Sequence, residues 1–243
     1  METQSFHNKC VLIKAYCASH STHGFLARFN TRKRATLDKQ GNIICFMERK
    51  HTCCVVLDVS LFLCSDACDL TLDPNTAHSR LVLSDGNKKI RRVFDRQPYP
   101  DHPERFDDVP QVLSVESLTG RCYWETEWSG SAVISVSYKG INRKGGWSDD
   151  CVFGNNDKSW SLECFDDEFT VCHNNNRTVI PAVHSSCNIV RVYYKRVGVY
   201  VDVSAGVLSF YSVSDTHTHT HIHTINTTFT EPLYAGFGGP YKP

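Results

Sequence analysis

From residue 68 onward the chain alternates short apolar runs with polar turns. The runs are rich in Val, Ile, Tyr, Phe and Trp, and Gly, Asn, Asp and Ser separate them. Such runs with period-two alternation are typical of half-buried strands. We see no sustained apolar pattern of period 3.6, so the sequence predicts an all-β fold, a twisted antiparallel β-sandwich. The predicted strands are 80–85, 121–128, 132–138, 159–165, 189–194, 197–203 and 207–213.

The alternation also predicts which side chains face the core. In AVISVSY, Ile134, Val136 and Tyr138 share one face, and Val133 lies on the other. In VGVYVDV (197–203) the four valines form one apolar face. We expect these faces to pack between the sheets.

The first 66 residues differ from the rest. They show no periodicity, and residues 1–67 hold 9 Lys/Arg against 5 Asp/Glu, while residues 68–243 hold 17 against 21. We therefore expect 1–66 to be a poorly ordered leader outside the folded core. The whole chain has a net charge of zero, so nothing favours nucleic acid or anionic membrane as a partner. The longest apolar run (53–64) is interrupted by Asp58 and falls short of the ~20 residues of a membrane helix.

The chain has twelve cysteines but no recognisable export signal, which predicts reduced thiols and a cytoplasmic location. Cys53, Cys54, Cys64 and Cys68 lack a Cys-x2-Cys pair and matching histidines, so we expect no zinc site there. Five others fall in the strand-rich part and are expected to be free and buried: Cys122, Cys151, Cys164, Cys172 and Cys187.

DTHTHTHIHT (215–224) places four histidines at two-residue spacing, which would put them on one face of an extended strand. They could in principle bind one metal ion. No further ligand or supporting residue can be named, so we favour a strand without an ion and require no metal.

Catalytic motifs are missing from the sequence. There is no G-x-S-x-G, Walker A or H-E-x-x-H pattern, and no helix can follow the glycine-rich AGFGGP (235–240). The acidic residues 166–168 and His173, which precedes three asparagines, suit turns. We expect no enzyme and no cofactor.

Six stretches together resemble the PRY–SPRY domain of fish tripartite-motif proteins, NACHT–leucine-rich-repeat receptors and stonefish-toxin-like proteins. The resemblance implies a PRY segment at 67–120 and an SPRY segment at 121–239, folded as one sandwich that binds a protein through loops at one end. It implies no catalysis. The stretches are CDLTLDPNTAH (68–78), QPYPDHPERFDDVPQVLSVESLTGRCYWETEW (97–128), ISVSYKGI (134–141), CVFGNNDKSWSLEC (151–164), VGVYVDVSAGVLSFYSVSD (197–215) and TTFTEPLYAGF (227–237).

The implied role is partner recognition in innate immune or ubiquitin-pathway sensing. One alternative is the substrate-recognition part of a ubiquitin ligase whose RING lies outside this chain, since residues 1–66 do not resemble a RING. Another is a small-anion sensor that uses Lys88, Lys89, Arg91 and Arg92.

Four irregular segments are candidates for the partner-binding loops: 85–110, 139–150, 173–178 and 214–218. Trp147, flanked by two glycines and a serine, is the best single anchor. Phe94 and Tyr99 could instead pack their loop against the sandwich. The predicted partner-binding residues are Arg91, Arg92, Phe94, Tyr99, Arg143, Trp147 and Arg177.

Overall fold

The computed structural model describes residues 66–165, 168–180 and 195–239, together with the backbone of three strands nearer the N-terminus. Those three are β1 (Cys10–Lys14), β2 (Arg34–Leu37) and β3 (Ile43–Phe46). The later elements are β4 (Leu81–Ser84), β5 (Lys89–Arg92), β6 (Gln111–Leu118), β7 (Arg121–Ser129), β8 (Ser131–Tyr138), the 3-10 turn η1 (Asp149–Cys151), β9 (Ser159–Phe165), β10 (Glu168–His173), β11 (Asn176–Ile180), β12 (Lys195–Asp202), β13 (Val207–Val213), β14 (His219–Asn226) and β15 (Leu233–Gly238).

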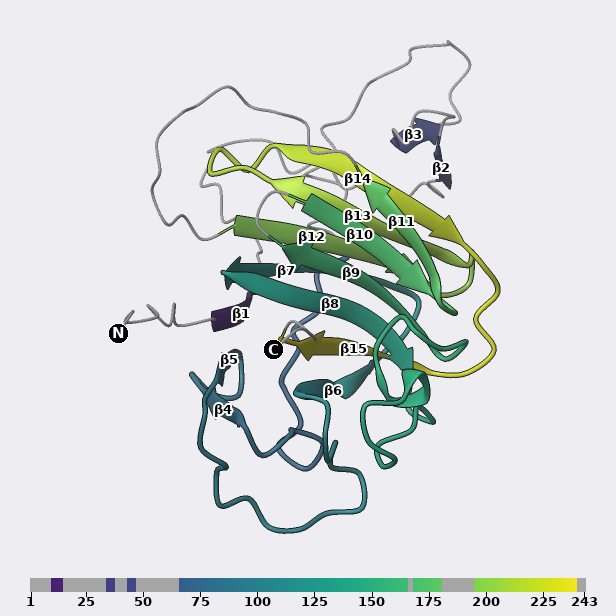
Figure 1. Cartoon of the computed structure of the whole chain (residues 1–243). Coiled ribbons are helices and arrows are strands. Elements are labelled where there is room, and N and C mark those ends of the chain that lie inside the picture. The colour runs from purple at the N-terminus through teal and green to yellow at the C-terminus, as the bar shows by residue number, and fades with distance from the viewer. Residues whose placement is uncertain are drawn as a thin grey trace.

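Two antiparallel sheets pack face to face (Figure 1). The seven-stranded sheet has the order β14-β13-β12-β7-β1-β5-β4, and the six-stranded sheet has the order β11-β10-β9-β8-β15-β6. The predicted antiparallel β-sandwich is confirmed. In the described part of the chain no helix is long and apolar enough to span a membrane.

The core lies between the sheets, where the alternating side chains meet. Trp124 and Val199 of one sheet and Ile134 and Leu162 of the other belong to one cluster, and each is fully buried. The predicted inward faces of β8 and β12 are therefore confirmed. The predicted strand 189–194 lies outside the described residues.

Strand β8 is buried on both faces, which alternation alone does not reveal. Its outward Val133 packs in a second cluster with Phe106, Ile141 and Phe153, which come from loops that cover the six-stranded sheet. Gly236 of the neighbouring β15 permits this contact, because a Cβ there would lie only 2.7 Å from Cζ of Phe153. The loops are thus part of the packed structure.

Strand β1 is an exception within residues 1–66, which the sequence analysis expects to lie outside the folded core. Its backbone pairs with β7 from Cys10↔Ser129 to Lys14↔Glu125, and on its other side with β5. Non-local pairing of this kind leaves no signature in local periodicity. The pattern around 10–14 therefore gave no indication of it.

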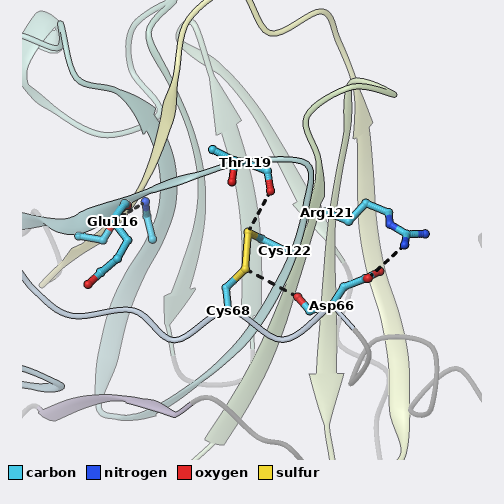
Figure 2. The surroundings of a disulfide bond; sticks show 8 residues. Asp66, Cys68, Glu116, Thr119, Arg121 and Cys122 are labelled. Atoms are coloured by element: carbon cyan, nitrogen blue, oxygen red, sulfur yellow. Dashed lines mark hydrogen bonds and ion pairs between the residues drawn. A yellow bond between two sulfur atoms is a disulfide. The ribbon is translucent and has the colours of Figure 1, made fainter.

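A disulfide joins Cys68 to Cys122 (Figure 2), which corrects the expectation that Cys122 is free. Beside it Arg121 forms an ion pair with Asp66 at 3.3 Å. Burial raises the pKa of Asp66, although Arg121 opposes this effect. The disulfide and the ion pair fasten the start of the described region to β7. Three cysteines are free and buried as predicted, namely Cys151, Cys164 and Cys172, whereas Cys187 lies outside the described residues.

The histidine run forms part of β14, but its side chains do not share one face. His221 pairs with Tyr211 and His223 with Phe210, across a bulge between those two neighbours on β13. Adjacent residues of a strand point to opposite faces, so the bulge turns His221 and His223 apart. His217 lies before the strand, with a φ of 60°. The shared face that a metal site needs is therefore lost.

His219 is held by the protein itself. Its Nε2 lies 2.7 Å from Oη of Tyr123, which donates a hydrogen bond to Glu125. Burial raises the pKa of Glu125, but the hydrogen bonds with His219 and Tyr123 and the nearby charge of Arg196 together lower it below its ordinary value. Within 66–165, 168–180 and 195–239, no three His, Cys, Asp or Glu side chains are grouped as metal ligands.

Candidate protein-binding surface

Two of the predicted loop segments are joined to each other. We call residues 101–108 and 139–148 the paired loops. The Asp107 carboxylate forms an ion pair with the ammonium group of Lys144 at 2.7 Å. The backbone N–H of Asp107 donates a hydrogen bond to the carbonyl of Arg143. The backbone N–H of Gly146 donates to the Asp108 carboxylate at 3.1 Å. These contacts hold the segment that leads to Trp147.

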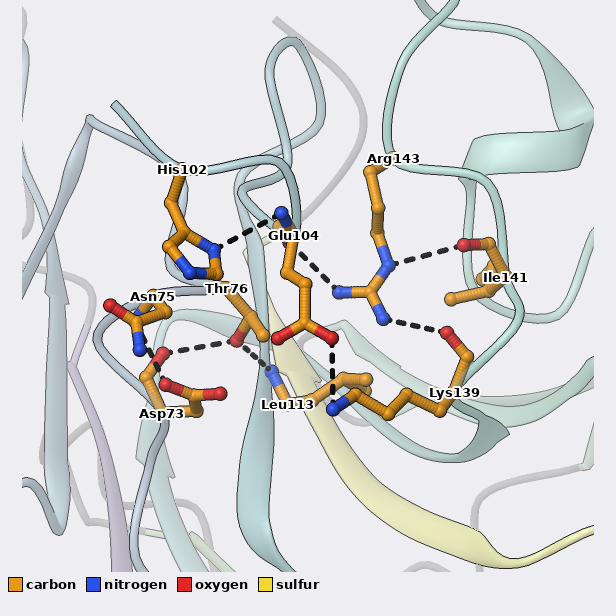
Figure 3. A network of polar contacts seen from close by, with 9 residues as sticks. All are labelled: Asp73, Asn75, Thr76, His102, Glu104, Leu113, Lys139, Ile141 and Arg143. Atoms are coloured by element: carbon orange, nitrogen blue, oxygen red, sulfur yellow. Dashed lines mark hydrogen bonds and ion pairs between the residues drawn. The ribbon is translucent and has the colours of Figure 1, made fainter. Parts of the chain in front are cut away.

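Arg143 lies at the centre of the paired loops (Figure 3). Its guanidinium donates to the carbonyls of Ile141, Glu104 and Lys139 at 2.8–3.1 Å, and lies 4.5 Å from the ring centroid of Phe106. Burial lowers the pKa of Arg143. Its donors point at loop carbonyls, so the geometry makes this predicted partner contact a brace for the loops.

An ion pair between Glu104 and Lys139 links the same two loops at 2.8 Å. The hydrogen bond to Lys139 lowers the pKa of Glu104, and the same bond raises the pKa of Lys139. Figure 3 shows that this pair lies beside the Arg143 contacts. The side chain of His102 accepts the backbone N–H of Glu104, which fixes the turn before it.

The paired loops rest on the LDPNTAH stretch. The hydroxyl of Thr76 donates to the carbonyl of Asp73 and accepts the backbone N–H of Leu113 (Figure 3). The backbone N–H of Phe106 donates to the carbonyl of Thr76 at 3.0 Å. The Phe106 side chain then enters the second cluster against Phe153, with ring centroids 5.7 Å apart. The loops are thereby fixed to β6 and the six-stranded sheet.

The turn between β10 and β11 meets the same region. Asn174 and Asn175 have φ values of 49° and 61°, so the predicted turn that tolerates positive φ is confirmed. The N–H of Asn174 donates to the carbonyl of Asn156, and Asn175 lies 3.5 Å from the carboxylate of Asp149. Three of the four predicted segments therefore meet over the six-stranded sheet. The fourth, 214–218, joins β13 and β14 at an edge of the other sheet.

Two of the predicted anchors are exposed. The side chain of Trp147 is 53% exposed, and that of Phe94 is 86% exposed. Trp147 follows Gly145 and Gly146, which have φ values of 121° and 79°. Glycine adopts this backbone without the cost of a Cβ, so the turn can present the indole outward.

The other predicted residues lie in varied surroundings. Tyr99 donates its hydroxyl to the carbonyl of Leu81 at 3.0 Å, so it follows the packing alternative, whereas Phe94 does not. Arg177 forms a two-point ion pair with Glu163 on the outer face of the six-stranded sheet. Arg91 is exposed on β5 and Arg92 is partly buried beside it, both in the seven-stranded sheet. None of the seven has been tested for binding, and each remains a prediction.

Arg105 is a supporting residue that the sequence analysis missed. It is only 7% exposed and donates to the carbonyls of Pro74, Ala77 and Pro100. Its guanidinium also lies 5.0 Å from the ring centroid of Tyr99. The HPERF sequence gives no sign of this role, because arginine is mostly a surface residue.

Comparisons with known proteins agree with this architecture. Residues 70–118 match the PRY family, described as the SPRY-associated domain. The solved PSpry domain of TRIM65 superposes with a TM-score of 0.64 at 24% identity, covering 76% of this chain and 92% of that one. The chain contains a PRY-family segment and shares the fold of a solved PSpry domain. This confirms the resemblance, and members of the family are protein-binding modules.

Relatives at higher identity carry the PRY–SPRY domain within longer chains. Stonustoxin subunit beta from Synanceia horrida is 42% identical over 171 residues, which cover 70% of this chain and 23% of that protein. Tripartite motif-containing protein 16 from Mus musculus is 39% identical over 174 residues, covering 70% and 29%. A solved stonustoxin structure superposes with a TM-score of 0.62 at 41% identity, over 72% and 26%. The chain thus spans about a quarter of the length of these curated relatives.

Proposed function

We propose that this PRY–SPRY domain recognises a protein partner through the paired loops, with Trp147 as the central anchor. The observation that carries the proposal is a large, half-exposed aromatic side chain on a loop that the protein itself holds in place. The domain acts by binding and performs no catalysis.

The energetic argument rests on pre-organisation. Binding a mobile loop costs conformational entropy, whereas a braced loop has already lost that freedom on folding. Arg143, Lys144 and Asp108 brace the segment that leads to Trp147. Burial of an exposed indole in a partner pocket then contributes directly to affinity, as Trp hot spots do.

The experiment compares two aromatic truncations in the full chain. Proteins captured from a lysate by wild type would be quantified against Trp147→Ala and Phe165→Ala, since Phe165 is similarly exposed at 58% but lies at the end of β9. Binding of any Trp147-dependent partner would then be measured with purified protein. We expect Trp147→Ala to weaken it by about 2 kcal/mol, roughly 30-fold, without changing the thermal midpoint. Equal binding by the wild type and Trp147→Ala would overturn the proposal.

The finer assignment is that the domain serves innate immune or ubiquitin-pathway sensing, or selects substrates for a ligase whose RING lies outside this chain. Its support is the similarity to a tripartite motif-containing protein. Co-purification of a ubiquitin-conjugating activity with the endogenous protein tests it. Absence of that activity from the endogenous complex would remove the ligase assignment.

A cytoplasmic location is also part of the proposal, and the Cys68–Cys122 disulfide weighs against it. Disulfides persist mainly in oxidising compartments. Alkylation of free thiols in intact cells before lysis distinguishes a reducing cytoplasmic location from an oxidising compartment. Two alkylated cysteines at these positions would support the cytoplasm, and a retained disulfide would contradict it.

A further inference from the structure

Positive charge gathers where β4 and β5 meet. We call Arg80, Arg92 and Arg96 the arginine cluster; Arg91, next to Arg92 on β5, points to the opposite face of the sheet. Arg92 pairs with Leu81 and Arg91 with Val82 in the ladder, and the N–H of Val93 donates to the carbonyl of Arg80. Burial lowers the pKa of Arg92, and the neighbouring charge of Arg80 lowers it further. Arg80 and Arg92 are therefore close enough for their charges to repel each other.

The local sequence supplies little acidic charge. The run KKIRRVFDR (88–96) contains one acidic residue, the exposed Asp95. Lys88 and Lys89 form ion pairs with Asp69 and Asp85. In the part of the chain that the structure describes, no ion pair involves the exposed Arg80 or Arg96.

Phe94 adds an apolar anchor to the arginine cluster. At 86% it is the most exposed of the large apolar side chains in the described region, and the guanidinium of Arg80 lies 5.9 Å from its ring centroid. Exposure of a whole phenyl ring to water is unfavourable relative to burial. An aromatic residue beside arginines is the combination that interface hot spots favour.

We propose that the arginine cluster and Phe94 bind an acidic peptide segment of a partner protein. Carboxylates of the segment would face the guanidinium groups, and an apolar side chain between them would cover Phe94. This rests on the proposed function, because it names the chemistry that one surface of the domain recognises.

The same groups fit other ligands less well. Guanidinium forks pair with carboxylates in two-point geometry, so Arg suits an acidic peptide. A free phosphate would satisfy guanidinium groups but leave Phe94 in water. An extended peptide can contact both the arginine cluster and Phe94, because they lie on an open surface at the edge of the seven-stranded sheet.

The probe is a fluorescent peptide that alternates Glu and Asp around a central Leu-Phe pair, compared with its Gln and Asn counterpart. Anisotropy titrations of the full chain would be made at low and at physiological salt. We expect the acidic peptide to bind at least about ten-fold more tightly than its counterpart, and more weakly as salt rises. Arg80→Gln with Arg96→Gln should weaken binding about ten-fold or more, and Phe94→Ala should weaken it at both salt concentrations.

A second double variant controls for net charge. Arg121→Gln with Lys158→Gln removes the same charge from residues that already contact Asp66 and the carbonyl of Gly140. It should bind the acidic peptide as wild type does, and thermal melts would confirm that both double variants are folded.

Three results would overturn the acidic-peptide proposal. The first is equal binding of the two peptides, or no binding of either. The second is full displacement by inorganic phosphate at equal concentration, which would indicate a small-anion site. The third is tighter binding to phosphatidylserine vesicles than to the peptide. A partner whose capture depends on Trp147 would still support the proposed function in each case, so the two failures are distinguishable.

Discussion

We expect the domain to lose stability between pH 6.5 and 4 because of one buried histidine, His78. Its side chain is 3% exposed, and its Nδ1 accepts the backbone N–H of Arg80 at 3.0 Å. Burial lowers its pKa from the ordinary value of 6.5 to about 4. A hydrogen bond with the Asp107 backbone opposes the change, and the charges of Arg96, Arg80 and Arg92 add to it.

The sign follows from which state binds the proton. Below pH 6.5 the unfolded chain protonates this imidazole, while the folded domain keeps it neutral until about pH 4. The contribution of His78 to stability is therefore fully present above pH 6.5 and decreases as the pH falls through this window. The difference between 6.5 and about 4 corresponds to about 3 kcal/mol of unfolding free energy.

The assay compares wild type with His78→Asn, whose Oδ1 can accept the same N–H but does not titrate. Urea unfolding of each protein would be followed by tryptophan fluorescence at intervals across this pH range. Other titrating groups are common to both proteins, so the difference between their free energies isolates His78. We expect that difference to change by about 3 kcal/mol in favour of the variant towards pH 4.

Two results would refute the reasoning. Parallel pH profiles for wild type and His78→Asn would show that the imidazole is not held neutral in the folded state. An NMR titration of the folded domain that placed the pKa of His78 near its ordinary value would show the same directly.

Three further results are expected. Reduction of Cys68–Cys122, whose partners are separated by 54 residues, should lower the unfolding free energy by about 4 kcal/mol, and equal urea midpoints with and without reductant would contradict this. Gly236→Ala should cost about 1–3 kcal/mol by overpacking against Phe153, with partial recovery in the double variant that also carries Phe153→Leu; a neutral Gly236→Ala would argue against the contact. Excess chelator should leave the thermal midpoint unchanged because His219 is already held by protein groups, and a drop of several degrees would indicate a bound metal.

The local sequence was sufficient to predict a strand and its inward face where burial of one face produces an alternating apolar pattern. Ile134 and Val136 alternate with Val133, and the structure places the first two in the main core and the third under the loops. The β-sandwich follows from many such runs. A pattern of period two cannot say that loops will cover the outer face, because that depends on where Phe106 and Phe153 fold back.

The errors arose where distant segments meet. The pairing of Cys68 with Cys122 depends on two backbones lying side by side, as the hydrogen bond from Cys68 to the carbonyl of Tyr123 shows. The insertion of β1 (Cys10–Lys14) between β7 and β5 is equally non-local. The bulge at β13 and β14 reverses the facing of His223, and no residue type in the run signals it.

Residue type alone does not distinguish an arginine that braces loops from one that is exposed. Arg143 and Arg91 suit an interface equally well in the sequence, yet the first donates to three loop carbonyls and the second is exposed. The difference lies in the loops around each arginine. Trp147 is 53% exposed after two glycines, and its role as an anchor stays a prediction.

His78 connects the two proposed surfaces. Its ring accepts the N–H of Arg80, which belongs to the arginine cluster, and interacts with the backbone of Asp107, which belongs to the paired loops. A neutral His78 ring adds no positive charge beside the arginines, so it does not increase the electrostatic repulsion among them. Protonation would add a buried cation beneath both surfaces at once. We therefore expect acid to weaken Trp147-dependent binding before the sandwich core itself unfolds; titrations of a purified partner against wild type and His78→Asn at pH 7 and pH 5 would test this, and equal pH dependence of the two would contradict it.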